Sequence, residues 1–330
     1  KETVTVVAGE DTDEIEFVNT EYGRFTLKKT TNTGADKDNW IFTVYTDSAC
    51  TPVAKDKNGN NVTLTTDANG AATSGYLLPG TYYVKETGGN KYSNPYWKPD
   101  SDKESVVVTA GSTNQTPIVF DNPHYGRIVV EKSTNTGNNL SGWTFTVYTD
   151  ANCRNVAKDK NGQNVTMVSK NNGVATSGYL LPGTYYVKET NGVGFEDGQD
   201  YYWTVSTETK TVTVVAGQDV RPAAANGVFT NTHYGRLQVI KDMDTVELNG
   251  KKKLAGWQFQ ITRNSDGADM GVYTTDANGE LITDKLLPGE YTITEIIDEV
   301  NGYYYCETTN PLTAIVTEGQ TKLVGGRERA

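Results

Sequence analysis

Hydrophobic and polar residues alternate in short runs along this chain, and turn-forming residues separate the runs. The clearest run follows a Leu-Pro-Gly turn and places Tyr82, Val84 and Glu86 on one face of an extended strand. The proline sets the backbone for the turn, and the glycine accommodates its unusual dihedral angle. The same turn and strand return at residues 178–190 and, less closely, at 286–295. This alternation predicts β-strands, and no stretch shows the period of an amphipathic helix.

A longer repeat groups these strands into domains. Tyr-Gly-Arg opens a strand at Tyr22, Tyr125 and Tyr234, so the sequence repeats about every 100 residues, which is the length of a domain. Each repeat then shows a Trp strand, the Leu-Pro-Gly strand, a Val-rich strand and, in the first two repeats, a short strand that ends in Asn. The resulting division is residues 1–20, the terminal strands of a preceding domain or a donor strand, then domain 1 at 21–123, domain 2 at 124–232 and domain 3 at 233–330.

Many short strands separated by turn signals predict an all-β fold, with an antiparallel Ig-like or prealbumin-like β-sandwich in each repeat. The linkers between repeats, such as residues 122–125, are only a few residues long. Because short linkers favour a stiff tandem array, we expect the domains to form an elongated rod.

Composition narrows the classes of function. The 330 residues carry a formal net charge of −11 and a sequence pI near 4.8, which argues against nucleic acid and anionic membrane surfaces as partners. No apolar run is long enough to span a membrane. The three Cys and two His show no spacing typical of a metal site or of a catalytic centre. We therefore expect no metal, no cofactor and no turnover of a substrate.

A polar residue ends the apolar, inward face of three strands in each of the first two repeats. The first strand ends this face with a lysine, the Leu-Pro-Gly strand with a glutamate, and the last strand with an asparagine. The lysines are Lys29, Lys132 and Lys241, the glutamates are Glu86, Glu189 and Glu295, and the asparagines are Asn122 and Asn231.

Such a cluster suggests a chemical reaction. Burial lowers the pKa of a lysine and raises that of a glutamate, so the lysine tends to a neutral, nucleophilic amine. The protonated glutamate can polarise the neighbouring carboxamide and transfer protons without being consumed. The product would be an isopeptide bond from lysine to asparagine, with loss of ammonia. The alternative is an ion pair with a hydrogen-bonded asparagine that is merely structural, and composition and spacing alone favour that alternative.

The three motifs, in this order, resemble the collagen-adhesin B-type (Cna-B, prealbumin-like) domains of Gram-positive surface proteins and pilins. The resemblance covers residues 21–330. In that family the lysine and the asparagine are joined, and the glutamate promotes the reaction. Carried over by position, the resemblance implies two crosslinks, Lys29–Asn122 promoted by Glu86 and Lys132–Asn231 promoted by Glu189.

Domain 3 departs from this pattern. Lys241 and Glu295 are present, but residues 321–330 show no asparagine and no apolar alternation, so neither a last strand nor an internal crosslink is predicted. Residues 1–20 carry an unattached strand that ends in Asn19. Two interpretations stay open: a longer array cut out of phase, or a covalent filament in which Asn19 of one chain bonds Lys241 of the next.

The sequence therefore predicts a structural protein, the shaft of a pilus or the stalk of an adhesin, whose only chemistry is single-turnover self-crosslinking. The resemblance implies a Gram-positive cell surface as its location and neighbouring domains or subunits of the same assembly as its partners. The alternative is a region that itself binds a host glycan or matrix protein. The aromatic loops around Trp97 and Trp203 are the candidates for that surface.

Overall fold

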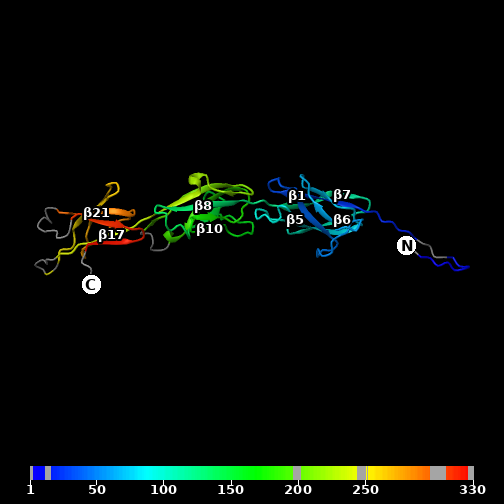
Figure 1. Ribbon diagram of the computed structural model, residues 1–330, viewed down its shortest axis with the longest axis horizontal. Coiled ribbons are helices and arrows are strands. Elements are labelled where there is room, and N and C mark those ends of the chain that lie inside the picture. The colour runs from blue at the N-terminus through cyan, green and yellow to red at the C-terminus, as the bar shows by residue number, and fades with distance from the viewer. Residues whose placement is uncertain are drawn as a thin grey trace. The chain divides into compact units, whose positions relative to one another are not determined.

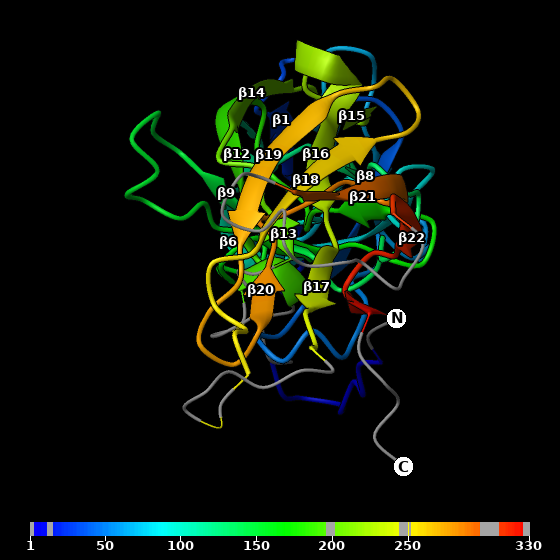
Figure 2. The same cartoon turned by 90° about the vertical axis from the view of Figure 1, so that its left-hand side faces the viewer.

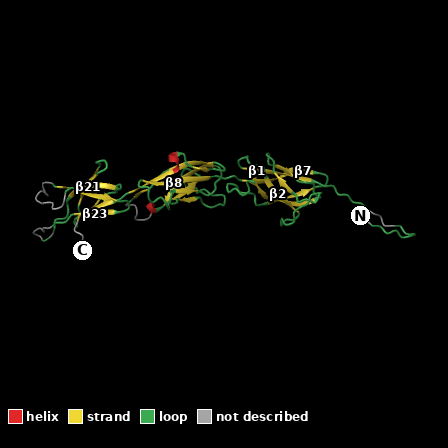
Figure 3. Ribbon diagram, viewed as in Figure 1, coloured by secondary structure: helices red, strands yellow, loops and turns green. Residues whose placement is uncertain are grey.

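Nearly all regular structure in this protein is β-strand, as the alternation predicts. The computed structural model describes residues 3–11, 16–195, 202–243, 250, 252–297 and 310–325. Within these ranges Figure 3 shows strands in all three domains and short helical turns in domain 2 alone. No helix in the described ranges is long and apolar enough to cross a membrane.

Domain 1 is a sandwich of two sheets (Figure 1). One sheet has the strand order β4-β1-β7 and the other β3-β2-β5-β6. The strands are β1 (Arg24–Thr31), β2 (Trp40–Tyr45), β3 (Thr63–Thr65), β4 (Ala71–Thr73), β5 (Gly80–Gly89), β6 (Lys103–Val108) and β7 (Thr113–Asn122). Burial alternates strictly along β1, and its inward residues Phe25 and Leu27 pack with Phe42 and Val84 in the core between the sheets.

Domain 2 repeats this architecture. Its sheets have the orders β10-β9-β12-β14 and β11-β8-β16-β13, and β15 also pairs with β8. The elements are β8 (Arg127–Thr134), β9 (Thr144–Tyr148), β10 (Thr166–Val168), β11 (Val174–Thr176), β12 (Gly183–Asn191), η1 (Val193–Phe195), β13 (Trp203–Thr204), β14 (Thr209–Val214), β15 (Asp219–Val220), η2 (Ala224–Gly227) and β16 (Val228–His233). Its core contains Trp143, Phe145 and Phe229.

Domain 3 has two sheets, with the orders β20-β17-β23 and β19-β18-β21-β22; Figure 2 shows the strands of the second sheet side by side. The strands are β17 (Arg236–Ile240), β18 (Gln258–Arg263), β19 (Asp269–Thr274), β20 (Glu280–Ile282), β21 (Gly289–Ile296), β22 (Leu312–Val316) and β23 (Thr321–Gly325). The expectation that this domain lacks a last strand was wrong, because β23 pairs with β17 from Arg236 to Ile240. Backbone hydrogen bonds make this strand, and they do not require an alternating sequence.

The first and last strands of every domain are parallel neighbours, which the expectation of purely antiparallel sheets missed. β1 pairs with β7, β8 with β16, and β17 with β23. In domain 1 the register places Lys29 beside Phe120 and Thr31 beside Asn122. Since both strands run in the same direction, the lysine and the asparagine that follow their apolar positions come to the same end of the sandwich.

The two strands predicted within residues 1–20 are not formed in the described part of that segment. Val6, Phe17 and Val18 are each at least 75% exposed, and Asn19 is also exposed. An extended segment needs a neighbour to complete its backbone hydrogen bonds, and none pairs with these residues in the described part of the chain.

Candidate functional site: a buried Lys–Glu–Asn cluster

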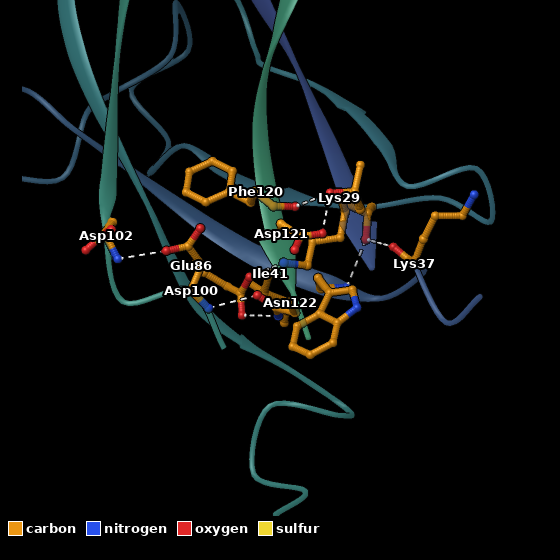
Figure 4. Close-up of polar contacts among 12 residues, drawn as sticks. Lys29, Lys37, Ile41, Glu86, Asp100, Asp102, Phe120, Asp121 and Asn122 are labelled. Carbon is orange, nitrogen blue, oxygen red and sulfur yellow. Dashed lines mark hydrogen bonds and ion pairs between the residues drawn. The ribbon is translucent and has the colours of Figure 1, made fainter. Parts of the chain in front are cut away.

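Three polar side chains meet in the core of domain 1. Lys29 on β1, Glu86 on β5 and Asn122 on β7 are each fully buried. Lys29 Nζ donates a hydrogen bond of 2.9 Å to Glu86 Oε2, and Asn122 Nδ2 donates one of 2.9 Å to Glu86 Oε1 (Figure 4). The glutamate comes from one sheet and bridges the lysine and the asparagine of the other. The structure thus brings the three predicted residues of this domain together.

Domain 2 builds the same cluster from Lys132, Glu189 and Asn231. Asn231 Nδ2 donates to Glu189 Oε1 over 2.6 Å, and Lys132 Nζ lies 2.9 Å from Glu189 Oε2. The second contact is close but poorly aligned for a hydrogen bond. Lys132 Nζ instead donates to the Phe229 carbonyl over 3.3 Å. The lysine and the glutamate therefore approach as closely as in domain 1, with the amine turned partly toward the backbone of β16.

Aromatic rings surround both clusters. Lys29 Nζ lies 5.1 Å from the ring centroid of Trp40, and Lys132 Nζ lies 4.4 Å from that of Trp143. In domain 1, Phe42 packs against Phe120 with ring centroids 4.7 Å apart. These side chains are fully buried, so the polar groups interact in a medium of low dielectric constant.

Burial shifts the pKa values of both ionisable partners toward their neutral forms. Desolvation lowers the pKa of Lys29 and raises that of Glu86, and their mutual hydrogen bond opposes both changes. In domain 2 desolvation lowers the pKa of Lys132 to about 8 and raises that of Glu189, against the attraction between the two groups. Both shifts lower the free-energy cost of passing a proton from the amine to the carboxylate, a transfer that would leave an uncharged amine beside a carboxamide.

Domain 3 contains only part of the cluster. Lys241 Nζ donates to Glu295 Oε1 over 2.7 Å, and their side chains are 13% and 7% exposed. Lys241 Nζ also lies 4.1 Å from the ring centroid of Trp257. No asparagine stands on β23, so the described residues give this pair no carboxamide from the last strand.

The interpretation of Trp97 and Trp203 as surface aromatics was wrong. Both are buried, and each stacks on a histidine at or just after the end of the last strand, β7 or β16: Trp97 on His124 at 3.8 Å between ring centroids, and Trp203 on His233 at 3.7 Å. Trp97 forms an isolated β-bridge with His124, and Trp203 lies on the two-residue strand β13, so neither stands in a run long enough for alternation to indicate which face is buried. The two tryptophans therefore belong to the core.

Two asparagines that the sequence analysis did not single out fix the ends of domains 1 and 2. Asn32 accepts a hydrogen bond from the His124 N–H and donates one to the His124 carbonyl. Asn135 makes the same two contacts with His233. The sequence signal was the recurrence of Thr-Asn-Thr-Gly at the end of the first strand of both repeats, at residues 31–34 and 134–137.

The architecture and the repeated cluster define a tandem array of prealbumin-like β-sandwich domains. The family model for the SpaA prealbumin-like fold domain matches residues 23–124, 126–220 and 239–328, and the chain belongs to this family.

The chain is also similar to individual proteins. It is 26% identical over 256 residues to Colossin-A of Dictyostelium discoideum, covering 73% of this chain and spanning only 2% of that relative's length. Among solved structures it resembles the Bacillus anthracis TIE protein, with 20% identity, a TM-score of 0.33 and coverage of 92% of this chain and 50% of that one. It also resembles BcpA, the major pilin subunit of Bacillus cereus, with 17% identity, a TM-score of 0.34 and coverage of 92% and 98%. A streptococcal ancillary pilin gives 17% identity, a TM-score of 0.33 and coverage of 94% and 100%. Because these TM-scores are so low, the likeness to the three solved structures does not indicate the function of this chain.

Proposed function

We propose that this chain is a structural segment of a surface fibre, a pilus shaft or an adhesin stalk, in which domains 1 and 2 each join their first and last strands covalently. The observation that carries this proposal is the position of Glu86, which contacts both Lys29 and Asn122 inside a dry core. The equivalent contacts of Glu189 in domain 2 support the same reaction there.

The reaction needs no group from outside the domain. Lys29 Nζ gives a proton to Glu86 and then attacks Cγ of Asn122, forming a new N–C bond. The bond from Cγ to Nδ2 breaks, Nδ2 leaves as ammonia with a proton that Glu86 delivers, and Glu86 takes the second proton from Nζ. Because the three groups are already in contact in the folded domain, the reaction has a high effective molarity. Each domain reacts once, so the chain turns over no substrate.

Such a bond would strengthen the domain against force. The chain enters domain 1 at β1 and leaves it after β7, so tension along the chain shears two parallel neighbours. A Lys29–Asn122 bond passes that tension through covalent atoms instead of the hydrogen bonds between the strands. The segment between the two crosslinked residues then carries none of the tension. An extracellular fibre, with neighbouring domains or subunits as partners, is the setting in which this property is useful.

Intact-mass measurement tests the proposal. We expect the chain to be lighter than its sequence mass by two ammonia molecules. Lys29→Ala and Glu86→Ala should each restore one of them, with peptide mapping placing the remaining crosslink in domain 2. Lys241→Ala is the matched control, because its domain offers no asparagine on the last strand, and it should leave the deficit at two. A wild-type mass equal to the sequence mass would show the cluster to be an ordinary buried ion pair.

The incomplete pair in domain 3 supports a second candidate, a bond between Lys241 of one chain and Asn19 of the next. Asn19 is exposed, and no strand among the described residues pairs with its segment. However, β23 already occupies the edge beside β17, so an incoming strand has to displace it or bind beyond Ile240. Denaturing electrophoresis should then show a ladder of multimers that Asn19→Ala abolishes, and monomer alone would exclude this bond.

A further inference from the structure

The carboxamide that the proposed reaction attacks is held at its oxygen as well as its nitrogen. Asn122 Oδ1 accepts a hydrogen bond of 2.8 Å from the backbone N–H of Asp100. In domain 2, Asn231 Oδ1 accepts one of 2.7 Å from the backbone N–H of Ser206. Both asparagines are fully buried, so this backbone donor takes the place of solvent at the oxygen.

The donor is at the same place in both repeats. Asp100 follows Trp97 by three residues, and Ser206 follows Trp203 by three residues. The side chains at the two positions differ in charge and size, whereas the backbone N–H and its contact are the same. The common feature is therefore the backbone group, which the buried tryptophan and the loop after it bring to the cluster.

These contacts determine which way the carboxamide faces. A rotation by 180° would point the Asn231 NH₂ group at the Ser206 N–H, so that two donors would face each other. The observed orientation pairs each donor with an acceptor, since Nδ2 donates to Glu189 and Oδ1 accepts from Ser206. The oxygen is thus turned away from the glutamate, which leaves the backbone N–H as the group placed to stabilise it.

We propose that the backbone N–H of residue 100 in domain 1 and of residue 206 in domain 2 is an oxyanion donor for isopeptide formation. This inference rests on the proposed function. When Lys132 Nζ adds to Cγ of Asn231, the C=O π electrons move to Oδ1, and the N–H is already aimed at the charge that develops there. The same N–H holds the oxygen as the C=O bond re-forms and ammonia departs.

The proton then follows a separate path through Glu189. The carboxyl group takes one proton from Lys132 Nζ before the attack. In the tetrahedral intermediate Nδ2 gains a lone pair, so its contact with Glu189 Oε1 reverses and the carboxyl group becomes the donor. Glu189 delivers that proton to Nδ2 and takes the second proton from Nζ, so that the products are one amide, one ammonia and a protonated Glu189. The oxyanion donor and the proton carrier are therefore different groups.

Replacing the backbone N–H of residue 206 by an ester oxygen tests the inference. Cell-free translation of the full chain with a suppressor tRNA that carries the α-hydroxy analogue of serine makes this change and preserves the side chain. Samples are quenched in acid at intervals, and peptide mapping reports the loss of ammonia in each domain separately. Domain 1 of the same chain is an internal standard, and Ser206→Ala, which keeps the N–H, is the matched control.

We expect the domain 2 crosslink to form about 100- to 1,000-fold more slowly, the usual effect of removing one oxyanion donor, and to reach the same final yield. Ser206→Ala should react within a few-fold of wild type. Hydrogen exchange of the β12 amides checks that domain 2 is folded, and the same ester at residue 100 gives an independent measurement in domain 1. An unchanged rate in a folded ester domain would overturn the inference. Absence of ammonia loss from the wild-type chain would instead refute the proposed function.

Discussion

Replacing Glu86 by glutamine should leave domain 1 folded but without its crosslink. Glutamine has nearly the shape of glutamate and can still contact Lys29 and Asn122, but it cannot accept a proton from the amine and pass it to the leaving nitrogen. Both reactants therefore remain in place and unjoined. The variant therefore separates the contribution of the covalent bond to stability from the contribution of packing.

The expected loss of stability follows from the size of the closed loop. A bond from Lys29 to Asn122 closes a loop of about 93 residues, and the chain-entropy relation used for disulfides gives about 4.7 kcal/mol at 25 °C for such a loop. Unfolding a domain of about 100 residues carries an entropy of roughly 0.21 kcal/mol/K, so the unfolding midpoint should fall by about 20 °C. The bond stabilises by restricting the unfolded chain, and this effect requires no loss of contacts in the folded domain.

Calorimetry on the intact chain, with the mass recorded for each sample, measures this shift. Glu295→Gln is the matched control, because it makes the same substitution beside Lys241 where no asparagine stands on the last strand. It reports the effect of removing a carboxylate from the pair without the loss of a crosslink. If Glu86→Gln loses one crosslink by mass but shifts its transition no further than Glu295→Gln does, the entropic reasoning is wrong.

Two further predictions concern domain 2. The rate of its crosslinking, followed by mass after cell-free synthesis, should fall on both sides of a maximum. Above about pH 8 it should fall about tenfold per pH unit, because Lys132, whose pKa burial lowers to about 8, loses the proton that Glu189 must pass to the leaving nitrogen. In acid it should fall again, because Glu189, whose pKa burial raises, is then already protonated and cannot take a proton from Lys132. A rate that instead rises through pH 8 would show that deprotonation of the amine alone limits the reaction. Asn135→Ala removes both hydrogen bonds to the backbone of His233 and should destabilise domain 2 by about 1–2 kcal/mol, measured by calorimetry. An unchanged midpoint would show that water replaces the asparagine without loss.

The sequence by itself determined which side chains of the longer alternating strands enter the cores. Alternation is a local property of an extended strand, so it correctly directed Lys29, Glu86 and Asn122 inward, and the repeats carried the same result to domain 2. It also predicted that domain 3 would present a lysine and a glutamate with no asparagine following them, although it wrongly predicted that the domain has no last strand. These features depend only on spacing along the chain.

Only the tertiary structure decided which groups became neighbours. The parallel pairing of β1 with β7, the burial of Trp97 against His124 and the position of β23 beside β17 are contacts between distant segments. The hydrogen bond from the backbone N–H of Asp100 to Asn122 could not be predicted from the sequence, because every residue except proline carries a backbone N–H. Strand pairing and loop closure depend on the whole domain, whereas the alternation of side chains depends on a few residues at a time.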